Sequence, residues 1–257
     1  MAGMSLFVVT GATGGFGSAI LRQINLMYSD KAIIIAASRN HEKLAKVTKG
    51  FTSKIIPVTV DFSVRAELTE KCQEILDVCK DNVFDHVYLY NNHATVGDVK
   101  KLVFEYEDPM ELCDNYFLNV VSFQILTSVF IKSFPGIKHT CVNLSSFAGV
   151  RPKESLSVYC AGKAARLMLY KVLALENPDV NVLSWSPGPM RTELALDIMH
   201  NSANVAYRQG FEKYEKSDDW TDADKSALKM LTIVRDGMYT SGQMLDFYDR
   251  AEPGILN

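Results

Sequence analysis

FVVTGATGGFGSAIL, residues 7–21, joins a run of β-branched apolar residues to the start of a helical pattern through a glycine-rich turn. Gly11, Gly15 and Gly17 stand in it with the spacing G-x-x-x-G-x-G. Glycine is needed where the backbone must turn tightly and approach a ligand without interference from a Cβ atom. A helix that begins directly after such a turn offers free N–H groups and the positive end of its dipole to an anion. The stretch therefore predicts a diphosphate-binding βα turn of a dinucleotide-binding fold; the alternative is a tight turn without a ligand.

The rest of the chain alternates between short apolar runs and helical patterns. Runs typical of strands lie at residues 5–9, 32–37, 55–60, 85–90, 140–145, 180–186 and 243–248. Helical patterns lie between them, near residues 16–28, 41–49, 64–80, 109–134, 155–176 and 222–236. Strands that are apolar on both faces and alternate with helices indicate a parallel sheet that is covered on each side. No linker divides the chain, so we expect one doubly wound, Rossmann-type α/β domain over residues 1–257, with a parallel seven-stranded sheet.

The composition is that of a soluble globular protein, with 47% hydrophobic and 22% charged residues. A net charge of -3 provides no basic field, so we expect neither nucleic acid nor an anionic membrane as a partner. The five cysteines are odd in number and never spaced C-x-x-C, which fits reduced thiols in the cytoplasm and predicts no metal site. No signal peptide is visible, and no apolar run approaches the roughly 20 residues that span a bilayer.

Residues 188–221 interrupt the alternation, because they contain no strand pattern and end in a polar stretch. A long excursion after a strand of such a sheet is typical of a lid or substrate loop. The alternative is a solvated connection that contains a helix of its own.

The end of the second strand predicts which nicotinamide cofactor is bound. A site for NAD places Asp or Glu there, to bind the ribose 2′-hydroxyl. Here the segment AASRN has no acid, and Ser38 and Arg39 take that place. A guanidinium binds a 2′-phosphate through charge-assisted hydrogen bonds, so the segment favours NADP(H), unless Arg39 is only a surface residue. Asp61 and Phe62 after the third strand, and Asn92 after the fourth, would reach the same edge of the sheet.

Two side chains with acid–base chemistry stand near the start of the helical pattern at residues 155–176. Tyr159 and Lys163 are four residues apart, so they lie on the same helix face, one turn apart. A phenol beside an ammonium has a pKa moved toward neutrality and can act as a proton donor, although such a pair also occurs by chance. Ser145 and Ser146 end the preceding strand and face the same crevice, and Gly188 follows the next strand.

Five motifs occur in order over nearly the whole length of the chain: T-G-x-x-x-G-x-G, N-N-x-A, a serine, Tyr-x-x-x-Lys and P-G. Together they resemble the motifs of the short-chain dehydrogenase/reductase family. The resemblance implies that Tyr159 protonates a substrate carbonyl, that Ser146 hydrogen-bonds the same oxygen, and that Lys163 binds the nicotinamide ribose and lowers the tyrosine pKa. It implies a supporting role for Asn119 in a water-linked proton relay. It assigns cofactor contacts to Gly11, Thr13, Gly14, Gly15, Phe16, Gly17, Ser38, Arg39, Asp61, Phe62, Asn92, Lys163, Met190 and Thr192. It assigns substrate contacts to Ser145, Ser146, Tyr159, Gly188 and Asp246.

Longer segments, among them GDVKK, YCAGKAARLML and SGQMLDFYD, resemble members of this family that reduce side-chain ketones of pterins. That pattern places a pterin-anchoring carboxylate at Asp246, which would accept two parallel donors from the pterin edge; the alternative is an ordinary carboxylate on an edge strand. A broader carbonyl or diketone reductase and a non-catalytic NADPH-binding sensor remain as alternatives. The resemblance also implies a homodimer formed through the helices at residues 109–134 and 155–176.

Two positions depart from the family pattern. Gly14 stands where related NADP-dependent enzymes often have a basic residue, so we expect a milder selectivity for NADPH. His93 stands where the usual N-N-A-G has alanine, and the pattern indicates no role for it.

Overall fold

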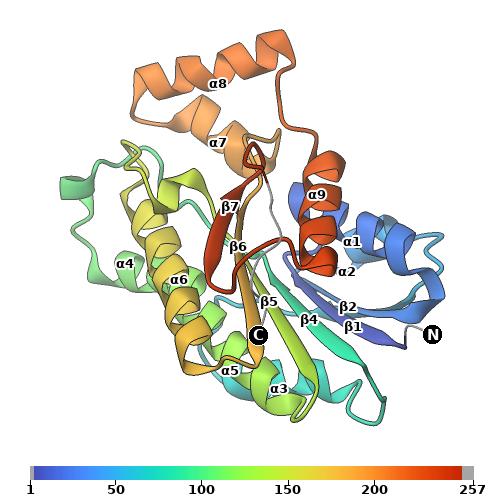
Figure 1. Ribbon diagram of the computed structural model, residues 1–257. Helices are drawn as coiled ribbons and strands as arrows, with labels where there is room; N and C mark the ends of the chain where they lie inside the picture. Colours follow the sequence, from blue (N-terminus) through green and yellow to red (C-terminus); the bar gives the residue numbers. More distant parts are fainter. Residues whose placement is uncertain (1–2, 251–257) are drawn as a thin grey trace.

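The computed structural model describes residues 3–250 of the chain. At its centre is a seven-stranded sheet with the order β3-β2-β1-β4-β5-β6-β7 (Figure 1). The strands are β1 (Ser5–Thr10), β2 (Ala32–Ser38), β3 (Lys54–Thr59), β4 (His86–Asn91), β5 (Lys138–Leu144), β6 (Val180–Ser186) and β7 (Gln243–Asp246). Every pair of neighbouring strands is parallel, which confirms the predicted doubly wound sheet.

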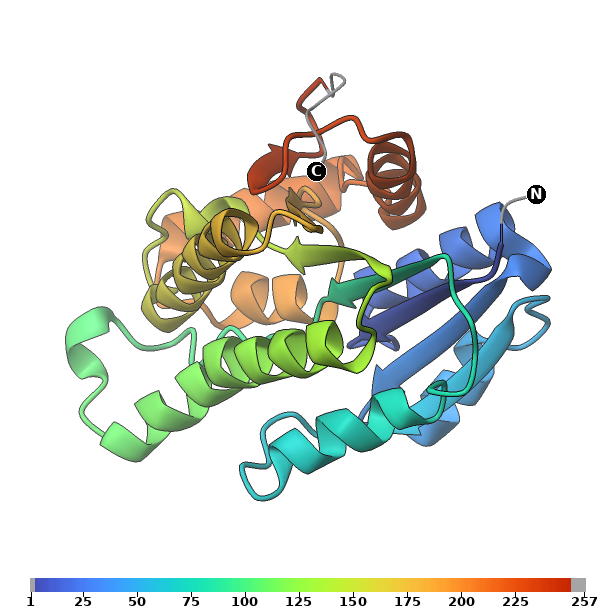
Figure 2. The ribbon, with the colours of Figure 1, turned by 60° about the horizontal axis from the view of Figure 1, so that its bottom comes forward.

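Helices cover both faces of this sheet (Figure 2). The α-helices of the described residues are α1 (Gly15–Tyr28), α2 (His41–Val47), α3 (Leu68–Asp77), α4 (Pro109–Tyr116), α5 (Ser122–Ser133), α6 (Ser157–Glu176), α7 (Glu193–Asn201), α8 (Val205–Ser217) and α9 (Ala223–Asp236). Phe7 and Val9 of β1 pack in the core under α1, α2 and α9. Leu6 and Val8 pack in the opposite core, under α3, α5 and α6. Alternate side chains of β1 therefore fill two cores, which is why the middle of this strand is apolar on both faces.

The strand order positions the ligand crevice. β1 lies at the centre, with β2 and β3 on one side and β4 to β7 on the other. The direction of winding thus reverses between β1 and β4, and ligands of such sheets bind beyond the carboxyl ends of the strands at this switch point.

The long helical pattern after β4 is one continuous helix with a π-helical turn inside it. Asp108 caps its start by accepting a hydrogen bond from Met110 N at 2.8 Å, and Pro109 occupies the first turn. The π-turn covers Phe117–Val121 and separates α4 from α5. It contains Asn119, and π-turns of this kind are frequent at functional sites.

By length and composition alone, the continuous helix Pro109–Ser133 is apolar enough to cross a membrane, with a mean hydropathy of 1.2 in its most apolar window. In the structure 39% of that window is buried. Phe123, Leu126 and Phe130 account for part of this burial, because they pack in the core beneath the sheet. The inner face of the helix thus belongs to the protein core.

Residues 188–221 contain the two helices α7 and α8, which lie together at one end of the molecule (top of Figure 1). The connection between them is tied to the rest of the protein. The hydroxyls of Ser202 and Ser155 are 2.6 Å apart, and Ala203 N donates to Val99 O at 2.9 Å. The segment therefore has the helical structure that its sequence left open, and it is anchored to two loops of the sheet.

Candidate active site

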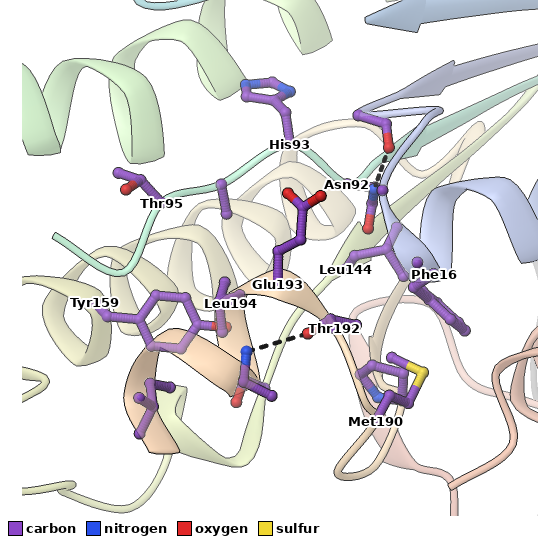
Figure 3. A pocket seen from close by; sticks show the side chains of 18 of the residues that line it. Phe16, Asn92, His93, Thr95, Leu144, Tyr159, Met190, Thr192, Glu193 and Leu194 are labelled. Atoms are coloured by element: carbon purple, nitrogen blue, oxygen red, sulfur yellow. Dashed lines mark hydrogen bonds between the residues drawn. The ribbon is translucent and has the colours of Figure 1, made fainter. Parts of the chain in front are cut away.

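A cleft of about 1490 Å³ opens at the carboxyl edge of the sheet, beneath α7 and α8. Ligand pockets usually measure about 300–1,000 Å³, so this cleft has room for a dinucleotide and a substrate together. All the predicted site residues line it except Gly17 and Asn119. In Figure 3 the ring of Tyr159 enters the cleft from the side opposite Phe16 and Asn92.

The glycine-rich turn forms one end of the cleft and has the shape that a diphosphate requires. Gly11 has a φ angle of +59°, which glycine adopts without strain. A Cβ atom on Gly17 would lie 2.2 Å from the Gly11 carbonyl oxygen, and one on Gly15 would lie 2.9 Å from a methyl group of Thr192. A Cβ on Gly14 would come no closer than 3.4 Å to its nearest neighbour, so a side chain is tolerated there. The turn and the free N–H groups of α1 therefore fit a dinucleotide.

Two cations stand where the second strand reaches the cleft. The Ser38 and Thr13 hydroxyls are 2.6 Å apart, which ties the end of β2 to the glycine-rich turn. Arg39 is exposed and lines the cleft directly after Ser38. Lys43, one turn further along on α2, also lines it, and its Nζ lies 3.4 Å from Glu193 Oε1 on α7. The sequence pattern did not single out Lys43, although it lies four residues after Arg39, in the helix that begins after Asn40.

Asp61 provides a fixed acceptor beside these cations. Its Oδ1 accepts hydrogen bonds from the backbone N and the hydroxyl of Ser63, at 2.9 and 2.7 Å. Burial alone would raise the pKa of Asp61, but the Ser63 hydrogen bonds and the charge of Arg39 together leave this pKa lowered. Asp61 is therefore an ionised carboxylate on the cofactor side of the cleft.

His93, for which the sequence indicated no role, is buried at the end of β4 and stacks on Phe62 with ring centroids 4.3 Å apart. Its Nδ1 lies 2.9 Å from Thr10 Oγ1, and its Nε2 lies 2.9 Å from Ser122 Oγ. Ser122 Oγ donates its own proton to Leu118 O at 2.7 Å, so it accepts from Nε2–H, and Nδ1 of the neutral ring accepts from Thr10 Oγ1. Burial, with nearby positive charges, lowers the pKa of His93 well below its ordinary value, so the ring is neutral.

Tyr159 and Lys163 lie one turn apart on α6, and both are buried at the inner end of the cleft. Lys163 Nζ is 5.5 Å from the centre of the Tyr159 ring and donates to Leu144 O at 2.5 Å. Burial lowers the pKa of Lys163 well below its ordinary value, and the charge of Arg166 adds to this. Burial raises the pKa of Tyr159, while the neighbouring Ser146 hydroxyl and Arg166 oppose the rise. The phenol is therefore protonated at neutral pH, and the prediction that Lys163 moves the Tyr159 pKa toward neutrality is wrong for this structure.

The two serines at the end of β5 present hydroxyls to the same part of the cleft. Ser146 Oγ accepts from Ala148 N at 3.1 Å, which fixes its orientation in a short helical turn. Ser145 Oγ is buried and has no hydrogen-bond partner among the described residues. A buried hydroxyl without a partner points to a ligand or water, so Ser145 has a donor available for a substrate.

Asn119 lies behind the cleft rather than on its lining. Its Oδ1 accepts from Thr95 N and its Nδ2 donates to Thr95 O, both at 3.0 Å. Its carbonyl oxygen accepts a hydrogen bond from Arg166 Nε. A Cβ on Gly162 would lie 3.1 Å from the Asn119 Cβ, so glycine at this point lets α6 approach closely. Asn119 thus links the π-turn to the segment after β4 and to α6, and its part in a proton relay stays a prediction.

Asp246 ends β7 and lines the cleft with only 8% of its surface exposed. It pairs in register with Ser186 at the end of β6, so the carboxylate stands beside the other substrate residues. Its Oδ1 accepts from Tyr248 N at 3.1 Å, and its own N–H donates to Asp249 Oδ2 at 2.8 Å. One oxygen is therefore held in place, and a carboxylate has capacity for further donors.

α7 and α8 close the cleft with an apolar and aromatic wall. Ile198 belongs to a small buried cluster with Tyr159, and Tyr207 and Phe211 pack against that cluster. Lys153 Nζ lies 5.7 Å from the centre of the Tyr207 ring. The sequence indicated a substrate loop here but not these residues; the only available signal was the spacing of two aromatic residues one helical turn apart.

Comparison of the sequence with known proteins identifies a matching family model and several similar proteins. The family model described as "short chain dehydrogenase" matches residues 5–203. Sepiapterin reductase of Bos taurus is 32% identical over 255 residues, which cover 96% of each chain. Sepiapterin reductase of Mus musculus is 31% identical over 96% of this chain and 98% of its own. A benzil reductase ((S)-benzoin forming) of Bacillus subtilis is 28% identical over 91% of this chain and 95% of its own.

Solved structures agree on the fold. The KRED1-Pglu enzyme superposes with a TM-score of 0.83 at 23% identity, covering 94% of this chain and all of its own. A short chain dehydrogenase/reductase from Saccharomyces cerevisiae superposes with a TM-score of 0.82 at 20% identity, covering 96% of this chain and 97% of its own.

Proposed function

Because the chain belongs to the short-chain dehydrogenase family, we propose that it is an NADPH-dependent oxidoreductase that reduces the side-chain ketones of pterins. Sepiapterin and 6-pyruvoyl-tetrahydropterin are the proposed substrates, in tetrahydrobiopterin biosynthesis. Similarity to sepiapterin reductases across 96% of the chain supports this choice. The single observation that carries it is the position of Asp246, a nearly buried carboxylate in the same cleft as Tyr159 and Ser146.

In this proposal the reacting carbonyl lies between Tyr159 and Ser146. Tyr159 is protonated at neutral pH and donates its proton to the carbonyl oxygen, while Ser146 donates a hydrogen bond to the same oxygen. Donors aimed at the charge that develops there stabilise the transition state by a few kcal/mol each. When bound, NADPH supplies the hydride. Lys163, Met190 and Thr192 line the cleft, and in this proposal they would hold the nicotinamide end of the cofactor.

Asp246 would anchor the pterin at the far end of the substrate. A pterin presents its 2-amino group and N3–H side by side, and one carboxylate can accept both hydrogen bonds. Because Tyr248 N fixes Asp246 Oδ1, the carboxylate is oriented before the ligand arrives. Such preorganisation favours binding in a defined pose.

The direct test is to incubate the purified protein with NADPH and sepiapterin. We expect the yellow colour of sepiapterin and the NADPH absorbance to disappear together, in a one-to-one ratio. Heat-denatured protein and protein with NADPH alone serve as controls. Reduction of a small diketone without any reduction of sepiapterin would overturn the pterin assignment and leave the oxidoreductase activity standing.

Arg39→Ala should weaken the binding of NADPH far more than that of NADH, since only NADPH carries the 2′-phosphate. Loss of a charge-assisted contact costs about 1.5–3 kcal/mol, or roughly ten- to a hundredfold in affinity. Titration of both cofactors into wild type and variant measures the two losses. Lys46→Ala removes a cation from the exposed side of α2, outside the cleft, and is the matched control for net charge.

Lys43 provides a second step in the same experiment. If Lys43 shares the phosphate with Arg39, the double variant with Lys43→Ala should lose further NADPH affinity and none for NADH. Equal losses for the two cofactors in Arg39→Ala would show that Arg39 does not select between them.

A second candidate function is reduction of a broader range of carbonyls and diketones. It is favoured by the aromatic wall of Tyr207 and Phe211, which suits an apolar substrate, and by the similarity to benzil reductases. In that case Asp246 would be incidental to substrate choice. A non-catalytic NADPH-binding sensor is the less favoured third reading, because Ser146, Tyr159 and Lys163 are all present.

The proposed enzyme is a homodimer in the cytoplasm. The outward side of α6 exposes a row of apolar residues, in which Met168 is 61% and Leu175 is 83% exposed. A row of this kind on a long helix suits contact with a second copy of the chain. Sedimentation of the purified protein is expected to give twice the 28.7 kDa mass of one chain.

A further inference from the structure

Arg166 is fully buried in the middle of α6, with an exposed fraction of 0%. Removing a guanidinium from water is costly unless it is paired and hydrogen-bonded. Among the described residues no carboxylate forms an ion pair with it: Nη2 donates to His93 O at 2.8 Å, Nε donates to Asn119 O, and Nη1 has no partner. Its Cζ lies 4.6 Å from the centre of the Phe123 ring, which gives a favourable cation–π contact. A charge kept in such a place calls for a reason other than packing.

The first reason is geometric. The two carbonyl oxygens that Arg166 binds belong to different parts of the site. His93 follows Asn92 just after the end of β4, and Asn119 lies in the π-turn. Arg166 itself stands on α6, three residues after Lys163. The planar fork of one guanidinium therefore joins three segments that meet behind the cleft, and a guanidinium is better suited to this than an ammonium.

The second reason is electrostatic. Tyr159, Lys163 and Arg166 occupy positions i, i+4 and i+7 of α6, so they form one stripe on its buried face. Burial lowers the pKa of Lys163 well below its ordinary value, whereas burial lowers that of Arg166 only to about 10. Arg166 therefore stays charged throughout the physiological range. Its charge acts to lower the pKa of Tyr159, against the effect of burial.

The other groups around Tyr159 do not supply that charge. His93, on the β4 side, is neutral. Cys160, the residue after Tyr159, raises the Tyr159 pKa rather than lowering it. Tyr207 of the facing α8 has a pKa raised to about 12 and is uncharged. Lys153 Nζ lies over the Tyr207 ring, 5.7 Å from its centre.

We propose that Arg166 is a positioning residue of the active site, which clamps the end of β4 and the π-turn against α6 and whose permanent positive charge stabilises the phenolate form of Tyr159. The phenolate is the state that follows proton donation to a ketone, so the consequence for catalysis rests on the proposed function. The clamp and the charge are properties of the protein itself and are tested without turnover.

The clamp is tested by hydrogen exchange in Arg166→Met and Arg166→Lys, with NADP⁺ bound. Methionine has a similar length and removes both the charge and the donors, and it also removes the cost of keeping an unpaired charge away from water. Amides in residues 92–96 and 117–122 should exchange about tenfold faster in Arg166→Met, since two charge-assisted hydrogen bonds are lost. Arg166→Lys should show a smaller increase, because one ammonium cannot span both carbonyls. Unchanged exchange in both variants would overturn the clamp.

The charge is tested by NMR of protein labelled with ¹³C at the tyrosine ring carbon that bears oxygen. The Tyr159 signal is identified by its absence in Tyr159→Phe and followed with pH in the NADP⁺-bound protein. In Arg166→Met its midpoint should lie higher than in wild type by about one pH unit or more, because a positive charge that favoured the phenolate is gone. Arg166→Lys, which keeps a charge, should shift less. Equal midpoints, or a phenol that stays protonated in both proteins up to unfolding, would contradict the charge.

Tyr170→Phe is the matched control. Tyr170 lies one turn beyond Arg166 on the same buried stripe, with its hydroxyl 3.3 Å from Thr127 Oγ1. The variant perturbs the same packing without touching the clamp, so both readouts should stay at wild-type values. If Tyr170→Phe changed them as much as Arg166→Met, the effect of Arg166 would be general loosening of the core. None of these measurements uses a pterin, so they stand or fall separately from the sepiapterin test.

Discussion

Ketone reduction by Tyr159→Phe is expected to fall by at least about a hundredfold, the usual scale of general-acid catalysis. Phenylalanine keeps the ring that fills the space beside Ile198 and removes only the hydroxyl that carries the proton. NADPH should bind the variant with nearly wild-type affinity, because its predicted contacts lie on the glycine-rich turn, at Arg39 and around Thr192. The loss should therefore appear in kcat, and a titration of NADPH measured alongside turnover separates the two effects.

Tyr170→Phe is again the suitable control, since it removes a hydroxyl from the same face of α6 three turns further on. Its turnover should equal that of wild type. A Tyr159→Phe enzyme that reduced ketones at a near-normal rate would rule out Tyr159 as the proton donor, and Ser146 or a bound water would have to take that role.

The pH dependence of the wild type follows from the same residue. The acid form of Tyr159 is the one that donates a proton, and burial raises its pKa from the ordinary value of 10.0. Reduction should therefore keep its proton donor across neutral pH and lose it only at alkaline pH. In the reverse direction the phenolate is the base, so alcohol oxidation should rise as pH increases through the same pKa.

The fold was predictable because its signals are local and agree with one another. Most of the strands are short apolar runs between helical patterns, and in a sheet buried on both faces such a run has few alternatives. The segment at residues 188–221 was less predictable. Its helices α7 and α8 are polar outside and are held by tertiary contacts such as the pair Ser155 and Ser202, which join residues far apart in the sequence.

The site divides in the same way. The glycines and the Tyr-x-x-x-Lys pair can be predicted from their spacing, because a single turn or a single helix face determines where they lie. Arg166 and His93 give no such signal, since their meaning depends on which backbone carbonyls and hydroxyls stand opposite them in the folded chain. The only hint for Arg166 was a charged residue on the buried stripe of a helix, seven residues after Tyr159. For Asn119 the family resemblance predicted a part in a proton relay. In the structure its side chain is hydrogen-bonded to the backbone N and O of Thr95 instead of lining the cleft.

Asp246→Asn is expected to lower kcat/KM for sepiapterin roughly five- to 150-fold, with little change for a small diketone. This loss corresponds to a cost of about 1–3 kcal/mol for a hydrogen-bond donor left without an acceptor. The structure makes the direction specific. Tyr248 N donates to Oδ1 of Asp246, so in the variant the amide oxygen should take that position and the NH₂ group should take the other. The second donor of the pterin would then face a donor instead of an acceptor, in a place with almost no access to water. NADPH binding should be unaffected, because its predicted contacts lie elsewhere in the cleft.

The comparison requires both substrates and a control for the local turn. Asp249→Asn removes a charge three residues away, from a carboxylate that accepts from Asp246 N but does not line the cleft. It should leave kcat/KM for both substrates unchanged. If Asp246→Asn lowered kcat/KM for both substrates alike, the role of Asp246 would be to support the fold of the turn rather than to bind the pterin. If kcat/KM changed for neither substrate, Tyr207, Phe211 and the rest of the aromatic wall would determine substrate choice. The broader carbonyl reductase would then be the better description. A loss confined to the pterin is the result expected from a buried carboxylate that has one oxygen already held and, among residues 3–250, no donor to the other.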